Sequence, residues 1–90
     1  MNRDEQRLRI GQRIAAIRKS IEWTDGQGIR RVGMTQKELG ERCGIRQNHI
    51  ARIERGYYSA GFDQLQAIAE GLGCEIDLVA TESQHTGHEQ

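Results

Sequence analysis

The chain has 90 residues, 36% of them hydrophobic, with two cysteines and no proline. This length holds one small domain, and a mean hydropathy of -0.75 without an apolar run near the ~20 residues of a membrane span excludes a membrane protein. The net charge is zero, but the charges are unevenly divided. Residues 1–58 contain all 13 Lys and Arg and seven acidic residues, whereas residues 59–90 contain six acidic residues and no Lys or Arg. No signal-peptide core is present, so we expect a cytoplasmic protein.

The first predicted element is a helix over residues 5–21. Isoleucines recur at intervals of four, three and four residues, which places them on one stripe of a helix: Ile10, Ile14, Ile17 and Ile21. We expect all four in the core. The lack of proline and the scarcity of aromatic residues favour a helical bundle over a sandwich or barrel.

Residues 22–33 are rich in glycine and separate this helix from the next. Asp25-Gly26, flanked by apolar residues, predicts a small β-hairpin, and a mobile loop with two solvated arginines is an equally good interpretation. The arginines are Arg30 and Arg31. A phosphate-contacting role for them rests on charge and position alone.

The next helix has a well-marked start. Thr35 and Glu38 form the T-x-x-E pattern of a capping box, and Met34 and Leu39 are spaced as a hydrophobic staple. We therefore expect the helix to begin at Gln36.

Two glycines shape the end of this helix. Gly40 lies inside it at a cost of roughly 1 kcal/mol against alanine, which predicts a close approach of another helix. Gly44 is expected to end the helix, because only glycine takes a positive φ without penalty. Two helices joined at Gly44 make a helix-turn-helix.

The second of these helices has an apolar and a polar side. Ile45, Ile50 and Ile53 mark the buried side, and the opposite side carries Gln47, Asn48, Ala51, Arg52 and Arg55. Arg can pair with guanine, and Asn or Gln with adenine, so this face suits the reading of bases in a major groove. The alternative is an ordinary solvated helix face. The motif spacing favours DNA binding.

A further helix is predicted over about 62–72, with its apolar residues facing inward: Phe62, Leu65, Ile68, Ala69 and Leu72. Gly61 is a tolerable cap, Gly73 ends the helix, and Cys74 is placed to make the apolar contact of such endings.

After Gly73 the pattern alternates. Ile76 and Leu78 fall on one side and Val79 on the other, which predicts a strand over 75–80. A lone strand is unstable in water, so we expect it to pair with the same strand of a second copy, with Ile76, Leu78 and Val79 at the dimer interface. The alternative is a short fifth helix. Residues 1–80 are then one domain, followed by a disordered polar tail over 81–90.

The segment MTQKELGERCGIRQNHIARIERG resembles the phage-repressor and Cro type of helix-turn-helix, the XRE family, and the likeness extends over roughly residues 8–74. The resemblance implies an all-α, compact four- to five-helix bundle that binds double-stranded DNA as a symmetric homodimer. It further implies that Gln36 touches a phosphate, that Glu54 pairs with Arg18, and that the bases are read by Gln47, Asn48 and Arg52, with contributions from His49 and Ala51.

Two departures from the family pattern stand out. The family places Ser or Thr before the recognition helix, whereas this chain has Arg46, a poor cap. Either the helix starts later, near Asn48, or Arg46 contacts a phosphate instead, as we also expect of Arg55. Residues 22–33 are longer than the family's usual turn.

Other chemistry finds little support. Cys43 and Cys74 occupy apolar positions, which favours free thiols, and His85 and His88 lack further ligands for a metal. We expect no catalytic residues, no cofactor and no metal. The sequence predicts a dimeric repressor. The alternatives are an antitoxin that also binds a partner toxin through its acidic C-terminal third, and a pure protein-interaction module.

Overall fold

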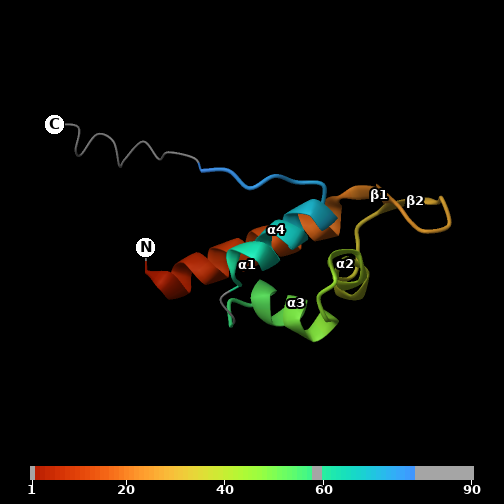
Figure 1. The fold of residues 1–90 in the computed structure, drawn as a ribbon. Coiled ribbons are helices and arrows are strands. Elements are labelled where there is room, and N and C mark those ends of the chain that lie inside the picture. Colours follow the sequence, from red (N-terminus) through yellow and green to blue (C-terminus); the bar gives the residue numbers. More distant parts are fainter. Residues whose placement is uncertain (1, 58–59, 79–90) are drawn as a thin grey trace.

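The computed structural model describes residues 2–57 and 60–78, and four helices and two strands occur in these ranges. In chain order they are α1 (Arg3–Ser20), β1 (Glu22–Thr24), β2 (Arg30–Val32), α2 (Gln36–Cys43), α3 (Gln47–Glu54) and α4 (Phe62–Gly71). In Figure 1, α1 is the longest element, and the hairpin lies at one end of the molecule. The helical bundle predicted from the sequence is confirmed.

The opening helix is longer at its start than the predicted 5–21. Asn2 caps it: its side chain accepts from the backbone N–H of Glu5, and the Glu5 side chain accepts from that of Asn2. Of the four isoleucines expected in the core, Ile14 is buried and Ile17 and Ile21 pack against the core. Ile10 is 41% exposed, so its assignment to the core was wrong. Its side chain lies in an open groove between α1 and α4.

The segment after α1 is a hairpin. β1 and β2 pair antiparallel, with Trp23 opposite Arg31, and Asp25 Oδ1 accepts from the backbone N–H groups of Gln27 and Ile29 in the loop. These bonds lower the pKa of the Asp25 carboxyl, the one from Ile29 most. Trp23 fixes the hairpin to the bundle, because its ring is buried and its Nε1 donates to the carbonyl of Gly33 at 2.8 Å.

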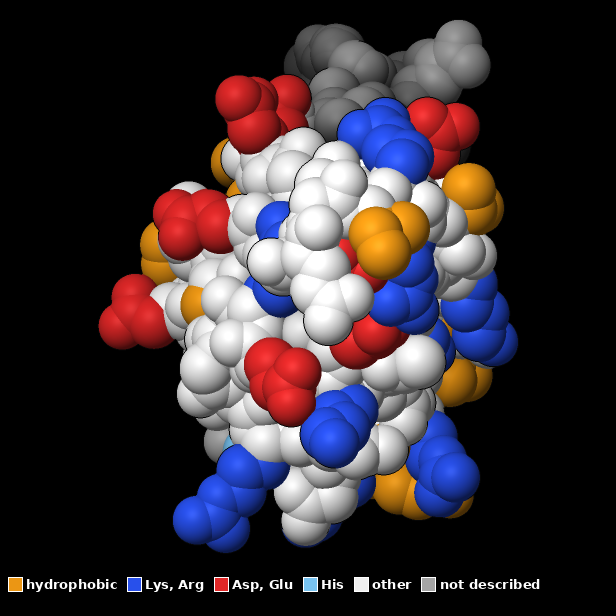
Figure 2. All heavy atoms as spheres, turned by 90° about the vertical axis from the view of Figure 1, so that its right-hand side faces the viewer, with side chains coloured by type: hydrophobic (Ala, Val, Ile, Leu, Met, Phe, Trp, Pro, Cys, Tyr) orange, Lys and Arg blue, Asp and Glu red, His pale blue; other side chains and the backbone are white. Residues whose placement is uncertain are grey.

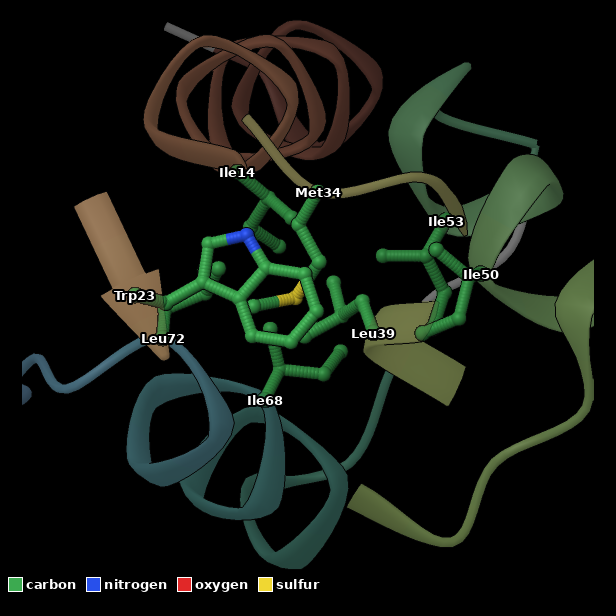
Figure 3. Packing of buried hydrophobic residues seen from close by; sticks show 8 residues of the cluster. All are labelled: Ile14, Trp23, Met34, Leu39, Ile50, Ile53, Ile68 and Leu72. Carbon is green, nitrogen blue, oxygen red and sulfur yellow. The ribbon is translucent and has the colours of Figure 1, made fainter. Parts of the chain in front are cut away.

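The core lies between the helices and β1. Figure 3 shows α1 on one side of the core and α4 on the other, with the Trp23 ring between them and Ile50 and Ile53 pointing toward Leu39. Leu39 and Ile50 are completely buried. The helices, β1 and the segments that connect them thus contribute to one apolar cluster: Ile14, Trp23, Met34, Leu39, Ile50, Ile53, Ile68 and Leu72.

Helix α4 ends at Gly71, one residue before the predicted end, and Gly73 is the glycine that terminates it, as predicted. Gly73 takes a φ of +71°, and the N–H of Cys74 donates to the carbonyl of Ala69 at 2.7 Å, which is the Schellman pattern. Phe62 was expected to face inward but is 67% exposed. It occupies the first position of the helix, where the side chain projects beyond the packed turns.

The described part of the C-terminal segment differs from both expectations. Residues 74–78 form neither a strand nor a fifth helix in the single chain. A strand there requires a pairing partner, and none of the described residues of the same chain supplies one. Val79, Ala80 and the tail over 81–90 lie outside the described residues.

Candidate nucleic-acid interface

The helix-turn-helix is held by two close backbone approaches. A Cβ added to Gly40 would lie 2.4 Å from the carbonyl oxygen of Ile45, and one added to Gly11 would lie 2.4 Å from that of Ile53. Gly44 adopts a φ of +74° at the end of α2. The turn at Gly44 is therefore confirmed, whereas the close approach at Gly40 is made by the turn that leads into α3, with the Ile45 carbonyl nearest. Helix α3 packs against both α1 and α2.

The two motif helices begin in different ways. Thr35 Oγ1 accepts from the N–H of Glu38 at 3.0 Å, and Glu38 Oε1 accepts from that of Thr35 at 2.8 Å, so the predicted capping box exists and α2 begins at Gln36. The bond from Thr35 is the main reason why the pKa of Glu38 is lowered. At the start of α3, the Arg46 side chain forms no cap, yet the helix begins at Gln47.

The outer face of α3 is polar and open. Gln47, Asn48 and Arg52 are exposed, whereas Ile50 and Ile53 on the opposite face are buried. Asn48 and Arg52 lie four residues apart, on one side of the helix. Three of the five predicted base-reading side chains are thus presented together from a helix whose back is anchored in the core.

The other two predicted base-reading residues, Ala51 and His49, are less exposed. Ala51 is half-buried. His49 is also half-buried, and its Nε2 lies 3.4 Å from Nε2 of Gln64, which places it toward α4. No local pattern indicates this contact, because Gln64 lies 15 residues further along the chain.

The predicted phosphate-contacting residues fall into two groups. Arg46 and Arg55 are exposed beside the two ends of α3. Gln36 is half-buried and its Nε2 donates to Glu54 Oε1 at 2.9 Å, which fixes the amide at the start of α2. Its nitrogen retains a second hydrogen for another acceptor.

The hairpin arginines are engaged by carboxylates. Arg30 lies 3.1 Å from Glu22, and Arg31 lies 3.1 Å from Glu38 and 3.5 Å from Asp25. The Arg31 guanidinium also forms a cation–π contact with Trp23, with its Cζ 5.2 Å from the centroid of the Trp23 ring. These contacts tie the hairpin to the first turn of α2.

Cationic side chains are present on the side of the molecule that carries the motif. In Figure 2, Lys and Arg side chains lie near the top, along the right-hand side and along the lower edge, and the lower edge is the side on which α3 lies in Figure 1. Exposed arginines at the two ends of α3 fit a polyanion more than an apolar ligand.

No described helix is both long enough and apolar enough for a transmembrane span. Within residues 2–57 and 60–78 no group of three or more His, Cys, Asp and Glu side chains is arranged to hold a metal ion, and His85 and His88 lie outside those ranges. Cys43 and Cys74 are free and half-buried, and burial raises the pKa of the Cys43 thiol.

Comparisons with known proteins agree with this geometry. A helix-turn-helix family model matches residues 29–79, more than half of the chain. The immunity repressor protein of Bacillus phage phi105 is 30% identical over 83 residues, 92% of this chain and 50% of that protein. An uncharacterized HTH-type transcriptional regulator of Sinorhizobium fredii is 44% identical over 45 residues, 50% of this chain and 23% of that protein.

The chain thus spans half the length of the first relative and less than a quarter of the second. No solved structure matches it significantly.

Proposed function

This chain belongs to the helix-turn-helix family, and we therefore propose that it is a sequence-specific DNA-binding transcriptional regulator that acts as a dimeric repressor. The observation that carries the proposal is the exposed face of α3, where Gln47, Asn48 and Arg52 project from a helix anchored by Ile50 and Ile53. The relatives' printed names, an immunity repressor and a transcriptional regulator, support the same function. The function proposed is binding, without catalysis.

In this proposal α3 enters the major groove. Arg52 donates two hydrogen bonds to a guanine, and the amides of Gln47 and Asn48 pair with adenine edges. Ala51 offers its methyl group to a thymine methyl. His49 contributes from the edge of the helix, beside Gln64.

Contacts with the DNA backbone hold the helix in register. Gln36 donates its second amide hydrogen to a phosphate while Glu54 holds the first. Arg46 and Arg55 neutralise phosphates on either side of the groove. Arg30 and Arg31 are already paired with carboxylates, so the proposal assigns the larger phosphate contribution to Arg46 and Arg55.

Two copies bind together, with their recognition helices in successive major grooves, ~34 Å apart along one face of the duplex. Ile76 is 44% exposed and Leu78 is 94% exposed in the single chain, so both side chains are available for an interface. Val79, the third predicted interface residue, lies outside the described residues. A homodimer would bury these apolar groups and would bind two-fold symmetric DNA sites.

A second function is favoured by one observation. Every described acid of the C-terminal third is exposed, and no Lys or Arg occurs there: the acids are Asp63, Glu70, Glu75 and Asp77. An antitoxin would use such a surface to bind a basic partner toxin while its α3 repressed the shared operon. A co-purifying basic protein would support this version.

The function is tested by selecting duplexes from a random pool at physiological salt with the full chain. The expected result is a preferred sequence with two-fold symmetry. A triple variant with Gln47, Asn48 and Arg52 changed to Ala should lose the preference, and Gln12→Ala on the exposed side of α1 should keep it. An unselected pool, and no gel shift at low salt, would overturn the proposal in favour of a protein-interaction module.

A further inference from the structure

A groove of about 350 Å³ runs between α1 and α4 on a surface that the helix-turn-helix does not use. Its floor is apolar, and it is lined there by Ile14, Ile17, Leu65, Ile68, Ala69 and Leu72. Ile10 of α1 stands at one edge and Ile76 of the C-terminal segment at the other, and both are more than two-fifths exposed. In the single chain this groove leaves part of the core's edge in water.

The two walls of the groove carry opposite charges. Arg13 lines the α1 side, with Arg9 one turn before it and beside Ile10. Glu75 and Asp77 line the other side. Among the described residues, none of these four charged side chains forms an ion pair.

Residues 75–78, which include the acidic wall, have backbone groups and an apolar side chain that are available to a partner. The backbone groups of residues 75–77 form no hydrogen bond with any residue in the described ranges. Leu78, at its end, is 94% exposed. The same chain therefore carries an apolar groove with a basic wall, and the acidic segment that lines its other side ends in an exposed leucine.

We propose that the groove of each copy receives residues 75–78 of a second copy. This deepens the dimer of the proposed function by naming the surface that the C-terminal segment meets. Leu78 of the partner covers the apolar floor, and the partner's acidic side chains lie against Arg9 and Arg13. Each copy lends its segment to the groove of the other, so the contact is reciprocal about a two-fold axis and closes at two copies. The two segments lie side by side, where their free backbone groups pair as strands.

The apolar part of the contact is tested with Leu78→Glu. Sedimentation equilibrium of the full chain should show a dimer for the parent and a dissociation constant raised at least about 100-fold for the variant. Val32→Glu is the matched control, because Val32 is 73% exposed but lies on the hairpin, outside the groove. A monomeric parent, or equal weakening by both variants, would overturn the proposal.

The charges give a sharper test. An Arg9→Glu, Arg13→Glu variant and a Glu75→Arg, Asp77→Arg variant should each be monomeric, because every contact in either homodimer brings like charges together. Mixed in equal amounts they should form a heterodimer, since both contacts then join opposite charges. Restoration by mixing requires the contact to run between chains, so unmixed monomers that stay monomers on mixing would rule it out.

The remaining outcomes separate this inference from the proposed function. Binding to a non-specific duplex at low salt reports α3 and should survive in the monomeric variants, with weaker affinity for a two-fold symmetric site. A parent protein that is dimeric but binds no duplex would refute the proposed DNA binding and leave the dimer contact standing. Protection of the Leu78 amide from hydrogen exchange that does not depend on protein concentration would place its contact within one chain and overturn the inference.

Discussion

Arg18 of α1 and Glu54 of α3, which are 36 residues apart in the sequence, form a buried bidentate ion pair. Arg18 Nε lies 2.7 Å from Glu54 Oε2, and Arg18 Nη2 lies 2.9 Å from Glu54 Oε1. Their side chains are 9% and 6% exposed. Arg18 Nη1 also donates to the carbonyl of Met34, and Gln36 donates to Glu54, so this pair joins α1 to both motif helices.

Replacement of Arg18 by Met should lower the free energy of unfolding by about 3–5 kcal/mol, because it leaves the Glu54 carboxylate buried without its partner. The Arg18→Met, Glu54→Met double variant should recover more than half of this loss, since no charge remains in the core. Urea denaturation of the three proteins measures both effects. A double variant as unstable as the single one would show that the pair itself contributes the stability.

The two glycines at helix contacts should not tolerate a methyl group. Gly11→Ala and Gly40→Ala each place a Cβ 2.4 Å from a backbone carbonyl oxygen, so the helices must move apart. We expect each to cost roughly 3 kcal/mol of stability. Gly26→Ala is the control, because a Cβ there meets nothing within 4 Å. Thermal unfolding followed by circular dichroism distinguishes them.

DNA binding should respond differently to the two exposed arginines of the recognition segment. Arg52→Ala should cost about 1–3 kcal/mol on the selected duplex and relax the preference at one base position. Arg55→Ala should weaken all duplexes alike and reduce the slope of affinity against salt by about one. Fluorescence anisotropy over a salt series tests both. An Arg52→Ala protein that binds selected and random duplexes as the parent does would refute base reading by this residue.

Trp23→Phe should destabilise the protein by about 1–2 kcal/mol, because it removes the Nε1–H that bonds the carbonyl of Gly33 while keeping an aromatic ring. The control is Ile29→Ala on the same hairpin, which is 54% exposed and should change stability by less than about 0.5 kcal/mol. Denaturant unfolding followed by circular dichroism measures both. Equal effects would mean that the hydrogen bond from Trp23 Nε1 to Gly33 adds no stability.

Acid should loosen the junction of hairpin and α2. The pKa values of Glu38 and Asp25 are lowered from their usual 4.5 and 3.8, chiefly by backbone N–H donors. A carboxyl with a lowered folded-state pKa stabilises the fold above its usual pKa, and this contribution is lost as the pH falls through the folded value. Unfolding free energy should therefore fall as pH drops below about 4.5. An Asp25→Asn, Glu38→Gln variant should show a shallower fall.

The elements predicted with local markers were found where the sequence placed them. The capping box of Thr35 and Glu38, the turn at Gly44 and the ending at Gly73 are all decided by a few neighbouring residues. The resemblance also supplied the pair of Glu54 and Arg18, a long-range contact that no local pattern contains.

The errors arose where burial depends on what lies opposite. Ile10 and Phe62 fit the helical stripes as well as Ile14 and Ile68 do, but Ile10 is 41% exposed in the groove between α1 and α4, and Phe62 is 67% exposed at the start of its helix. The same reasoning that marked Gly40 would have marked Gly11, since both are glycines inside helices. The orientation of His49 could not be foreseen, because it depends on Gln64 of another helix.

The base of the hairpin is closed by two backbone bonds, from Gly33 N–H to the carbonyl of Ile21 at 2.7 Å and from Met34 N–H to that of Arg18 at 2.9 Å. The chain therefore departs from the bundle and rejoins it at one spot, while the tip at Gly26 and Gly28 has open space around it. A fluorophore or a peptide attached at that tip would move with the domain and would not alter the spacing of α1 and α2. The protein thus offers a ready attachment point for single-molecule tracking along a duplex.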